Sequence, residues 1–199
     1  MSATDSSALV RCWSTGDEGY LRYHDEEWGR PVRDERGVYE RLCLEGFQSG
    51  LSWLTILRKR PAFREAFAGF DPDRVARFAE RDVERLLVDA GIVRHRGKIE
   101  AAIANARATV ALRKAGEPLH ELFWNHAPAA HEAPASPAEW AATTPESAVL
   151  AKRLRLAGFR FVGPTTVYAA MQACGVVNDH LAGCWVRNTV EREIRTLKL

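Results

Sequence analysis

The stretch LRLAGFRFVGPTT, residues 154–166, shows that this chain is built from helices joined by tight turns. Gly158 accommodates the left-handed backbone angles that often end a helix. Pro164 suits the first turn of the next helix because its ring fixes the helical φ and its missing amide is not needed there. The short segment between them contains a second glycine, Gly163. We therefore predict two helices connected by a short hairpin.

Glycine, proline and capping residues also indicate where helices begin and end in the rest of the chain. Apolar residues recur with helical spacing from Val38 onward, and no alternating strand pattern or internal repeat persists. Residues 12–30 are predicted to form a compact loop with short helical pieces. Residues 117–147 are predicted to form a long connection with short helices, with a mobile insertion as the alternative. The further helices are predicted near 52–60 (ending before Pro61), 72–79 (with Asp71 as its cap), 81–89, 95–115, 144–157 and 164–174. The predicted fold class is all-α.

Length and composition limit the class of protein. The chain has 199 residues, of which 46% are apolar, and its net charge is +2. We expect one domain or two packed lobes over residues 10–187, a disordered tail over 1–9 and a C-terminal extension over 188–199. No apolar run is long enough to span a membrane, and the N-terminus lacks the pattern of a secretory signal. A cytoplasmic monomer is expected, and the small net charge does not by itself indicate nucleic acid.

The hairpin around Gly163 has the pattern of a helix–hairpin–helix element, which binds DNA through the backbone. Free amides at the start of the second helix can hold a phosphate oxygen. Basic residues flank the hairpin at 152, 153, 155 and 160, and a second basic cluster spans 91–98. An ordinary connection between two helices and a solvated helix end are the alternatives.

Two cysteines and two histidines near the chain ends suggest a metal site. His180 and Cys184 are four residues apart, which would place them on one face of a helix. Cys12 and His24 lie near the other end of the chain. Two thiolates and two imidazoles form a closed tetrahedral set that suits structural zinc, although isolated histidines and cysteines are more often core or surface residues. The other two cysteines, at 43 and 174, are predicted to be buried apolar residues.

Glu45 stands out because it interrupts an apolar helix among many aromatic residues. Burying a carboxylate without a partner is costly, so this side chain either faces solvent or serves a site. Aromatic rings attract a flat cationic base through its face, and the carboxylate would attract its polar edge. The alternative is an aromatic core with no ligand. The aromatic residues concerned are Trp13, Tyr20, Tyr23, Trp28, Phe47 and Trp53.

Five stretches together resemble the bacterial 3-methyladenine DNA glycosylase I family. They are YHDEEWG (23–29), LEGFQSGLSW (44–53), DAGIVRHRGKI (89–99), GFRFVG (158–163) and MQACGVVNDH (171–180). The resemblance extends from Cys12 to Cys184, and it implies a helix–hairpin–helix DNA repair glycosylase that hydrolyses the N-glycosidic bond of 3-methyladenine. The implied partners are double-stranded alkylated DNA and the released free base.

The resemblance also implies roles for individual residues. Cys12, His24, His180 and Cys184 would bind one structural zinc ion. Glu45 and Tyr23 would bind the polar edge of the lesion as the catalytic pair. The substrate would also be held by Trp53, Trp13, Tyr20 and Phe47. Leu51 would wedge into the gap left by a flipped base, and the other DNA contacts would come from Gly163, Arg94, Lys98, Arg160 and Thr165.

The chain departs from many helix–hairpin–helix glycosylases at two positions. Asn178 stands where a catalytic aspartate is often found, and the neighbouring Asp179 is one position off, so it is not assigned that role. Thr165 stands nearest the place of the lysine that lyase-type members carry. A monofunctional enzyme without backbone-cleaving activity is therefore expected.

Two rival functions remain compatible with the sequence. A non-catalytic DNA-binding module would share the hairpin and the metal, but it would not need a pocket around Glu45. A glycosylase for another lesion, such as 7-methylguanine or a neutral deaminated base, is the second rival. A neutral leaving base would want a general acid, and the sequence offers no clear candidate.

Overall fold

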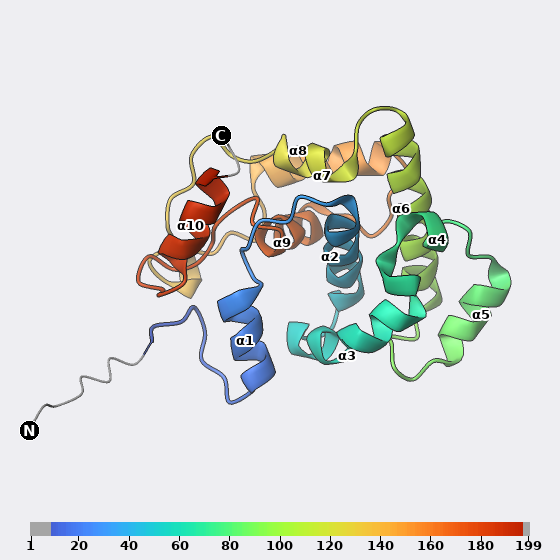
Figure 1. The fold of residues 1–199 in the computed structure, drawn as a ribbon, viewed down its shortest axis with the longest axis horizontal. Helices are drawn as coiled ribbons and strands as arrows, with labels where there is room; N and C mark the ends of the chain where they lie inside the picture. The colour runs from blue at the N-terminus through green and yellow to red at the C-terminus, as the bar shows by residue number, and fades with distance from the viewer. Residues whose placement is uncertain (1–8, 197–199) are drawn as a thin grey trace, which may run out of the picture.

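The computed structural model describes residues 9–196, and within them the chain forms α-helices, two short 3₁₀ helices and no strand (Figure 1). The predicted all-α class is confirmed. The elements are α1 (Glu18–Glu26), α2 (Glu35–Gln48), α3 (Trp53–Ala66), η1 (Ala68–Phe70), α4 (Pro72–Val75), α5 (Glu80–Val88), α6 (Arg96–Lys114), α7 (Leu119–Trp124), η2 (Pro137–Glu139), α8 (Pro145–Leu156), α9 (Pro164–Ala173) and α10 (Arg187–Thr196). Residues 1–8, most of the tail predicted over 1–9, lie outside the described residues.

Polar side chains begin several of these helices as the sequence predicts. The Asp71 carboxylate accepts from the backbone amides of Asp73 and Arg74, at the start of α4. Thr144 and Ser147 bond each other's backbone amides at the start of α8. Each cap satisfies amides that have no partner inside the helix.

The predicted end of the third helix is wrong. α3 continues through Pro61 to Ala66, although a proline inside a helix removes one backbone hydrogen bond. The continuation places Phe63, which is fully buried, 4.6 Å from Phe47 between ring centroids. Burial of this aromatic surface offsets the missing bond.

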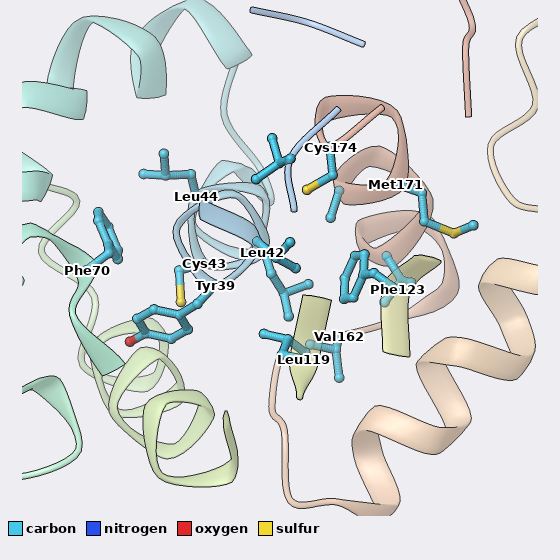
Figure 2. Close-up of a cluster of buried hydrophobic side chains, with 14 of the residues drawn as sticks. Tyr39, Leu42, Cys43, Leu44, Phe70, Leu119, Phe123, Val162, Met171 and Cys174 are labelled. Atoms are coloured by element: carbon cyan, nitrogen blue, oxygen red, sulfur yellow. The ribbon is translucent and has the colours of Figure 1, made fainter. Parts of the chain in front are cut away.

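Helix α2 lies at the centre of the fold, between α6 and α9 (Figure 1). Its side chains point to both sides. Figure 2 shows the Tyr39 side chain on one side of α2, while the Leu42 side chain points toward Phe123 and Met171. The Tyr39 hydroxyl donates to the Ala102 carbonyl of α6 at 2.8 Å. The buried side chains of α2, Glu45 among them, are therefore held in place by neighbouring helices.

The hairpin between α8 and α9 forms, but its turn differs from the prediction. Gly158 has a φ of 95°, as expected for a residue that ends a helix, whereas Gly163 has an ordinary φ of −69°. The left-handed residue inside the turn is Phe161, with a φ of 55°. Buried Asn105 of α6 fixes this shape, since its side chain accepts from the Arg160 amide at 2.7 Å and donates to the Arg160 carbonyl at 3.1 Å.

The two ends of the described chain meet at one end of the molecule (Figure 1). Most of the predicted C-terminal extension, residues 188–199, belongs to the amphipathic helix α10, which buries Val190 and Ile194; residues 197–199 lie outside the described residues. Arg30, just after α1, pairs with Glu193 of α10. Residues 180–184 form a turn and not the predicted helical face.

The long connection over 117–147 is packed against the rest of the protein. It contains α7 and η2, and its Pro134 carbonyl accepts from the amide of Ala182 at 2.8 Å. This contact joins the connection to the turn that contains His180. Across residues 9–196, no helix is long and apolar enough to cross a bilayer.

Candidate active site and metal centre

Cys12, His24, His180 and Cys184 converge into one buried group, as the sequence predicts. Their ligand atoms all lie within 4.8 Å of one another. The Cys12 sulfur is 3.3 Å from Nδ1 of His180, and the Cys184 sulfur is 3.5 Å from Nε2 of His24 and from Nδ1 of His180. Ligands at metal distances of about 2.0–2.3 Å from a tetrahedral ion are separated by roughly 3.3–3.8 Å. The group can therefore hold a metal ion of that size.

The outward-facing nitrogen of each histidine has a hydrogen-bond acceptor. Nδ1 of His24 is 2.7 Å from the Asp25 carboxylate, which is itself paired with Arg11. Nε2 of His180 is 3.0 Å from the Trp28 carbonyl. These acceptors fix the proton on the outer nitrogen, so that the inner nitrogen of each ring is free to bind a metal.

Next to this centre lies a cavity of about 300 Å³ whose walls are mostly aromatic. It is lined by Trp13, Tyr20, Tyr23, Trp28, Glu45, Gln48, Trp53, Trp140, Ala169 and Gln172. The cavity and the metal centre share helix α1, because Tyr23 lines the cavity and His24 faces the metal centre. The Trp13 ring also contacts the His24 ring at 4.7 Å between centroids.

Glu45 is the acidic side chain in the wall of this cavity, and burial keeps it largely protonated at neutral pH until a cation enters. It is 8% exposed, and burial raises the pKa of its carboxyl group from 4.5 to about 8, with no opposing contribution from a cation or a hydrogen bond. A carboxylate in such surroundings gains free energy from any positively charged ligand that enters. The arrangement favours a cationic, flat ligand.

The tyrosines beside Glu45 remain neutral donors. Burial, and secondarily the charge of Glu45, raises the pKa of Tyr23 and Tyr20 above 10. A protonated hydroxyl can donate a hydrogen bond to a ligand. Two more donors lie in the same walls, since the indole nitrogens of Trp13 and Trp53 are buried without a hydrogen-bond partner in the structure. Buried donors without partners are rare in folded proteins.

Two predicted ligand-contacting residues lie elsewhere. Phe47 is 1% exposed and packs against Phe63 and Phe67 in the core, so it does not line the cavity. Lys98 is also buried, and its ammonium group donates to the carbonyls of Phe47 and Ser49, at the end of α2. A cation at a helix C-terminus stabilises the last carbonyl groups. We therefore remove Phe47 from the base-contacting set and Lys98 from the DNA-contacting set.

The remaining predicted DNA contacts are accessible. Leu51 is 42% exposed on the loop between α2 and α3. Arg94, Arg160 and Thr165 are also exposed. No side chain caps the first amides of α9, which Gly163 precedes. These amides are available to a phosphate oxygen.

Sequence reasoning missed three kinds of residue in this region. Trp140, Ala169 and Gln172 line the cavity but lie far from the aromatic cluster in the sequence, and Gln48 lines it about one helical turn after Glu45. The second kind is the acceptors that bond the outer nitrogens of His24 and His180. One of them is the backbone carbonyl of Trp28, which no side-chain pattern reveals. The third is Phe161 at the hairpin. It is 43% exposed and has a left-handed backbone, and a large exposed apolar residue in that conformation is uncommon.

Comparison with known proteins places this geometry in a family. The family model described as methyladenine glycosylase matches residues 13–188. The chain is 49% identical over 180 residues to DNA-3-methyladenine glycosylase 1 of Escherichia coli strain K12, with 88% of this chain and 96% of that protein covered. The chain belongs to the 3-methyladenine DNA glycosylase I family. The Escherichia coli relative is named as a glycosylase that acts on 3-methyladenine in DNA.

Solved structures of the family agree with the fold. A crystal structure of 3-methyladenine DNA glycosylase I that is 49% identical has a TM-score of 0.85 and covers 88% of this chain and 98% of its own. The enzyme from Staphylococcus aureus, whose structure addresses 3-methyladenine recognition, is 33% identical with a TM-score of 0.85, and the match covers 90% of this chain and 97% of that chain.

Proposed function

We propose that the cavity around Glu45 receives the methylated adenine after it has been flipped out of the DNA duplex. The observation that carries this proposal is a buried carboxylate with no charge partner among aromatic rings. Glu45 and Tyr23 would bind the polar edge of the base, and Trp53 and Trp13 would cover its faces, with Tyr20 beside them. A related 3-methyladenine DNA glycosylase I has been crystallised with 3-methyladenine, and it is 33% identical to this chain with a TM-score of 0.83.

The reaction needs few protein groups beyond those that bind the base. Methylation at N3 makes the adenine cationic, so the base leaves in neutral form and needs no general acid. The cavity can select the base by its positive charge, and it can accelerate the reaction by fixing the extruded base in position. The bond between the sugar and N9 breaks, its electron pair stays with the base, and water supplies the new hydroxyl on the sugar.

The residues near the position of a superfamily catalytic aspartate are already engaged. The Asn178 side chain donates to the Arg187 carbonyl and to Glu191. The Asp179 carboxylate, which is 3% exposed, accepts from Tyr168 at 2.8 Å and from Gln172 at 2.6 Å. Thr165 stands where a lyase would need an amine. These contacts support a monofunctional glycosylase.

The hairpin, the loop before α3 and the basic loop before α6 would hold the DNA. Gly163, Thr165 and Arg160 would contact the phosphate backbone through the exposed start of α9, and Arg94 would contact a neighbouring phosphate. Leu51 would fill the gap that the flipped base leaves in the duplex. The target would be double-stranded alkylated DNA, with free 3-methyladenine as the product.

The four-residue metal centre would hold one structural zinc ion. Two thiolates and two imidazoles suit zinc, and all four positions of the tetrahedron are taken by the protein. The ion would supply folding free energy and no step of the reaction. Both this centre and the cavity are complete within one chain, which supports a monomer, and unpaired thiols suit the reducing cytoplasm.

Base release tests the proposed role of Glu45. Methylated duplex DNA is incubated with the wild-type protein and with Glu45→Gln, and the released bases are separated by chromatography. Losing a charge-assisted contact costs on the order of 1.5–3 kcal/mol, so we expect kcat/KM for 3-methyladenine to fall roughly 10- to 100-fold. Release of 3-methyladenine by Glu45→Gln at the wild-type rate would remove Glu45 from the site.

A fold control accompanies this assay. Glu121 is an exposed carboxylate on α7, outside the cavity. Glu121→Gln should keep wild-type excision, and both variants should keep helical circular dichroism. If Glu45→Gln loses helical structure, the deciding measurement becomes the binding of free 3-methyladenine by the fraction that remains folded.

A further inference from the structure

Trp140 extends the aromatic wall of the cavity from a segment that is distant in the sequence. Neighbouring rings follow one another from Trp53 to Tyr23 (5.4 Å between centroids), to Tyr20 (6.4 Å), to Trp13 (5.1 Å) and to Trp140 (6.4 Å). The Trp140 ring also meets Trp28 edge-on at 6.0 Å. Trp140 therefore closes the wall on the side where α9 contributes Ala169 and Gln172.

Hydrogen bonds to Asp179 hold Trp140 there. The Trp140 indole donates to the Asp179 carbonyl at 2.9 Å. The Asp179 carboxylate pairs with His131, from the same connection, and also accepts from Tyr168 and Gln172 of α9. One buried residue thus holds the connection at two points and joins it to the second helix of the hairpin.

These contacts place the Trp140 ring at the cavity and also fix its orientation. A ring that only covered the protein core would not line a cavity that also contains Glu45. A ring on a free loop would lack a buried partner for its indole nitrogen. Trp140 has both the cavity position and the fixed orientation that a substrate-contacting residue needs.

We propose that Trp140 is a further base-contacting residue of this enzyme and that it helps to select the lesion by size and shape. The proposal rests on the proposed base pocket around Glu45. The ring would contact the extruded base opposite Trp53, and Asp179 with His131 would act as positioning residues that keep the ring in place. Stacking against aromatic side chains contributes about 1–3 kcal/mol per base, which corresponds to a change in affinity of roughly 5- to 150-fold.

The test compares Trp140→Ala and Trp140→Phe with the wild-type protein in two assays. One measures binding of free 3-methyladenine by calorimetry, and the other measures kcat and KM for release of 3-methyladenine and of 7-methylguanine from methylated duplex DNA. For Trp140→Ala we expect base affinity to fall about 10-fold, and the preference for 3-methyladenine over the larger 7-methylguanine to fall. Trp140→Phe keeps a ring but loses the bond to Asp179, so it should recover part of the affinity.

The positioning role has its own variant. His131→Ala removes one of the two contacts that the connection makes with Asp179 and leaves Trp140 present. It should weaken base binding less than Trp140→Ala does, and combining the two substitutions should add little to Trp140→Ala alone. Fully additive effects of the two substitutions would overturn the positioning role of His131.

Trp185 provides a matched control, because its ring is 44% exposed and does not line the cavity. Trp185→Ala should leave base affinity and lesion preference unchanged. If Trp140→Ala unfolds, Trp140→Phe decides the question by its lesion preference and base affinity. Wild-type affinity and preference in both folded Trp140 variants would overturn the proposal, even when Glu45→Gln loses base binding. If Glu45→Gln keeps wild-type excision, the proposed pocket itself is wrong.

Discussion

The metal centre and the base cavity lie side by side on helix α1, yet they differ in how their polar atoms are satisfied. At the metal centre, both outer histidine nitrogens have acceptors, and the Cys12 sulfur accepts from the Leu181 amide. In the cavity, the indole nitrogens of Trp13 and Trp53 lack partners, and burial alone sets the raised pKa of Glu45.

This difference separates a centre that holds the fold together from one that is built for a ligand. Buried polar groups normally find partners within the protein. A group of ligands whose surroundings are complete needs only a metal ion to become a structural unit. A cavity that retains uncompensated polar groups gains free energy when a complementary molecule enters. Substitutions at the two places should therefore have opposite consequences for stability.

Breaking the metal centre should have the largest effect. Cys184→Ser removes one of the four residues that would hold an ion between the two ends of the described chain. Zinc contributes on the order of 10 kcal/mol in small zinc-dependent domains, so the variant should unfold at a much lower temperature and contain little zinc after purification. Metal analysis and thermal unfolding followed by circular dichroism measure both.

A second buried cysteine gives the control for this prediction. Cys174 is buried away from the metal centre, and burial raises the pKa of its thiol to about 12. Cys174→Ala should therefore keep wild-type zinc content. Zinc at nearly one ion per chain in Cys184→Ser would contradict the assigned ligand set.

Neutralising the cavity should stabilise the free protein at high pH. The pKa of Glu45 is about 8 in the folded state and near 4.3 when unfolded. The unfolded chain therefore loses this proton first, so the free energy of unfolding falls as pH rises from about 4 to 8. Each unit of pKa difference corresponds to about 1.4 kcal/mol.

The measurement is urea unfolding of the wild type and Glu45→Gln at pH 5 and pH 9. We expect the wild type to lose on the order of 3 kcal/mol relative to Glu45→Gln between these two pH values. Glu121→Gln serves as the control and should follow the wild type. A constant difference between the wild type and Glu45→Gln across this range would show that Glu45 is not held in an apolar, unpaired state.

Loosening the hairpin should have a smaller effect and leave both centres intact. Asn105→Ala leaves the amide and the carbonyl of Arg160 without their side-chain partner, at a cost of about 1–3 kcal/mol. DNA affinity should fall while binding of free 3-methyladenine stays at the wild-type level. Asn125→Ala, an exposed change at the end of α7, is the control. An equal loss of free-base binding in Asn105→Ala would show that the hairpin and the cavity are one unit.

The sequence predicted these centres to different degrees. The four expected metal ligands converge in one buried group, and Glu45 and Tyr23 both line the cavity, but the pairing of Glu45 with Tyr23 came from the family resemblance and not from residue types alone. Phe47 and Lys98 have suitable chemistry but face the core and the end of α2, and which face a residue occupies in an almost continuously apolar helix depends on tertiary packing. Pro61 illustrates the same point, because packing of Phe63 outweighs a local helix-breaking preference.

The parts that the sequence did not reveal depend on contacts between distant segments. Trp140 stands in a stretch rich in alanine and proline, and contacts with distant residues, among them Asp179 and Trp28, bring it to the cavity. Asn105 looks like an ordinary polar residue of a long helix until the hairpin closes on it. No local pattern encodes such pairings.

A crystal structure of this protein with 3-methyladenine tests the central claim most directly. The account predicts a carboxylate oxygen of Glu45 within hydrogen-bonding distance of the base, roughly 2.6–3.2 Å, with the base between the rings of Trp13 and Trp53. A base seated elsewhere, or a Glu45 carboxylate turned away from it toward solvent, would contradict the account.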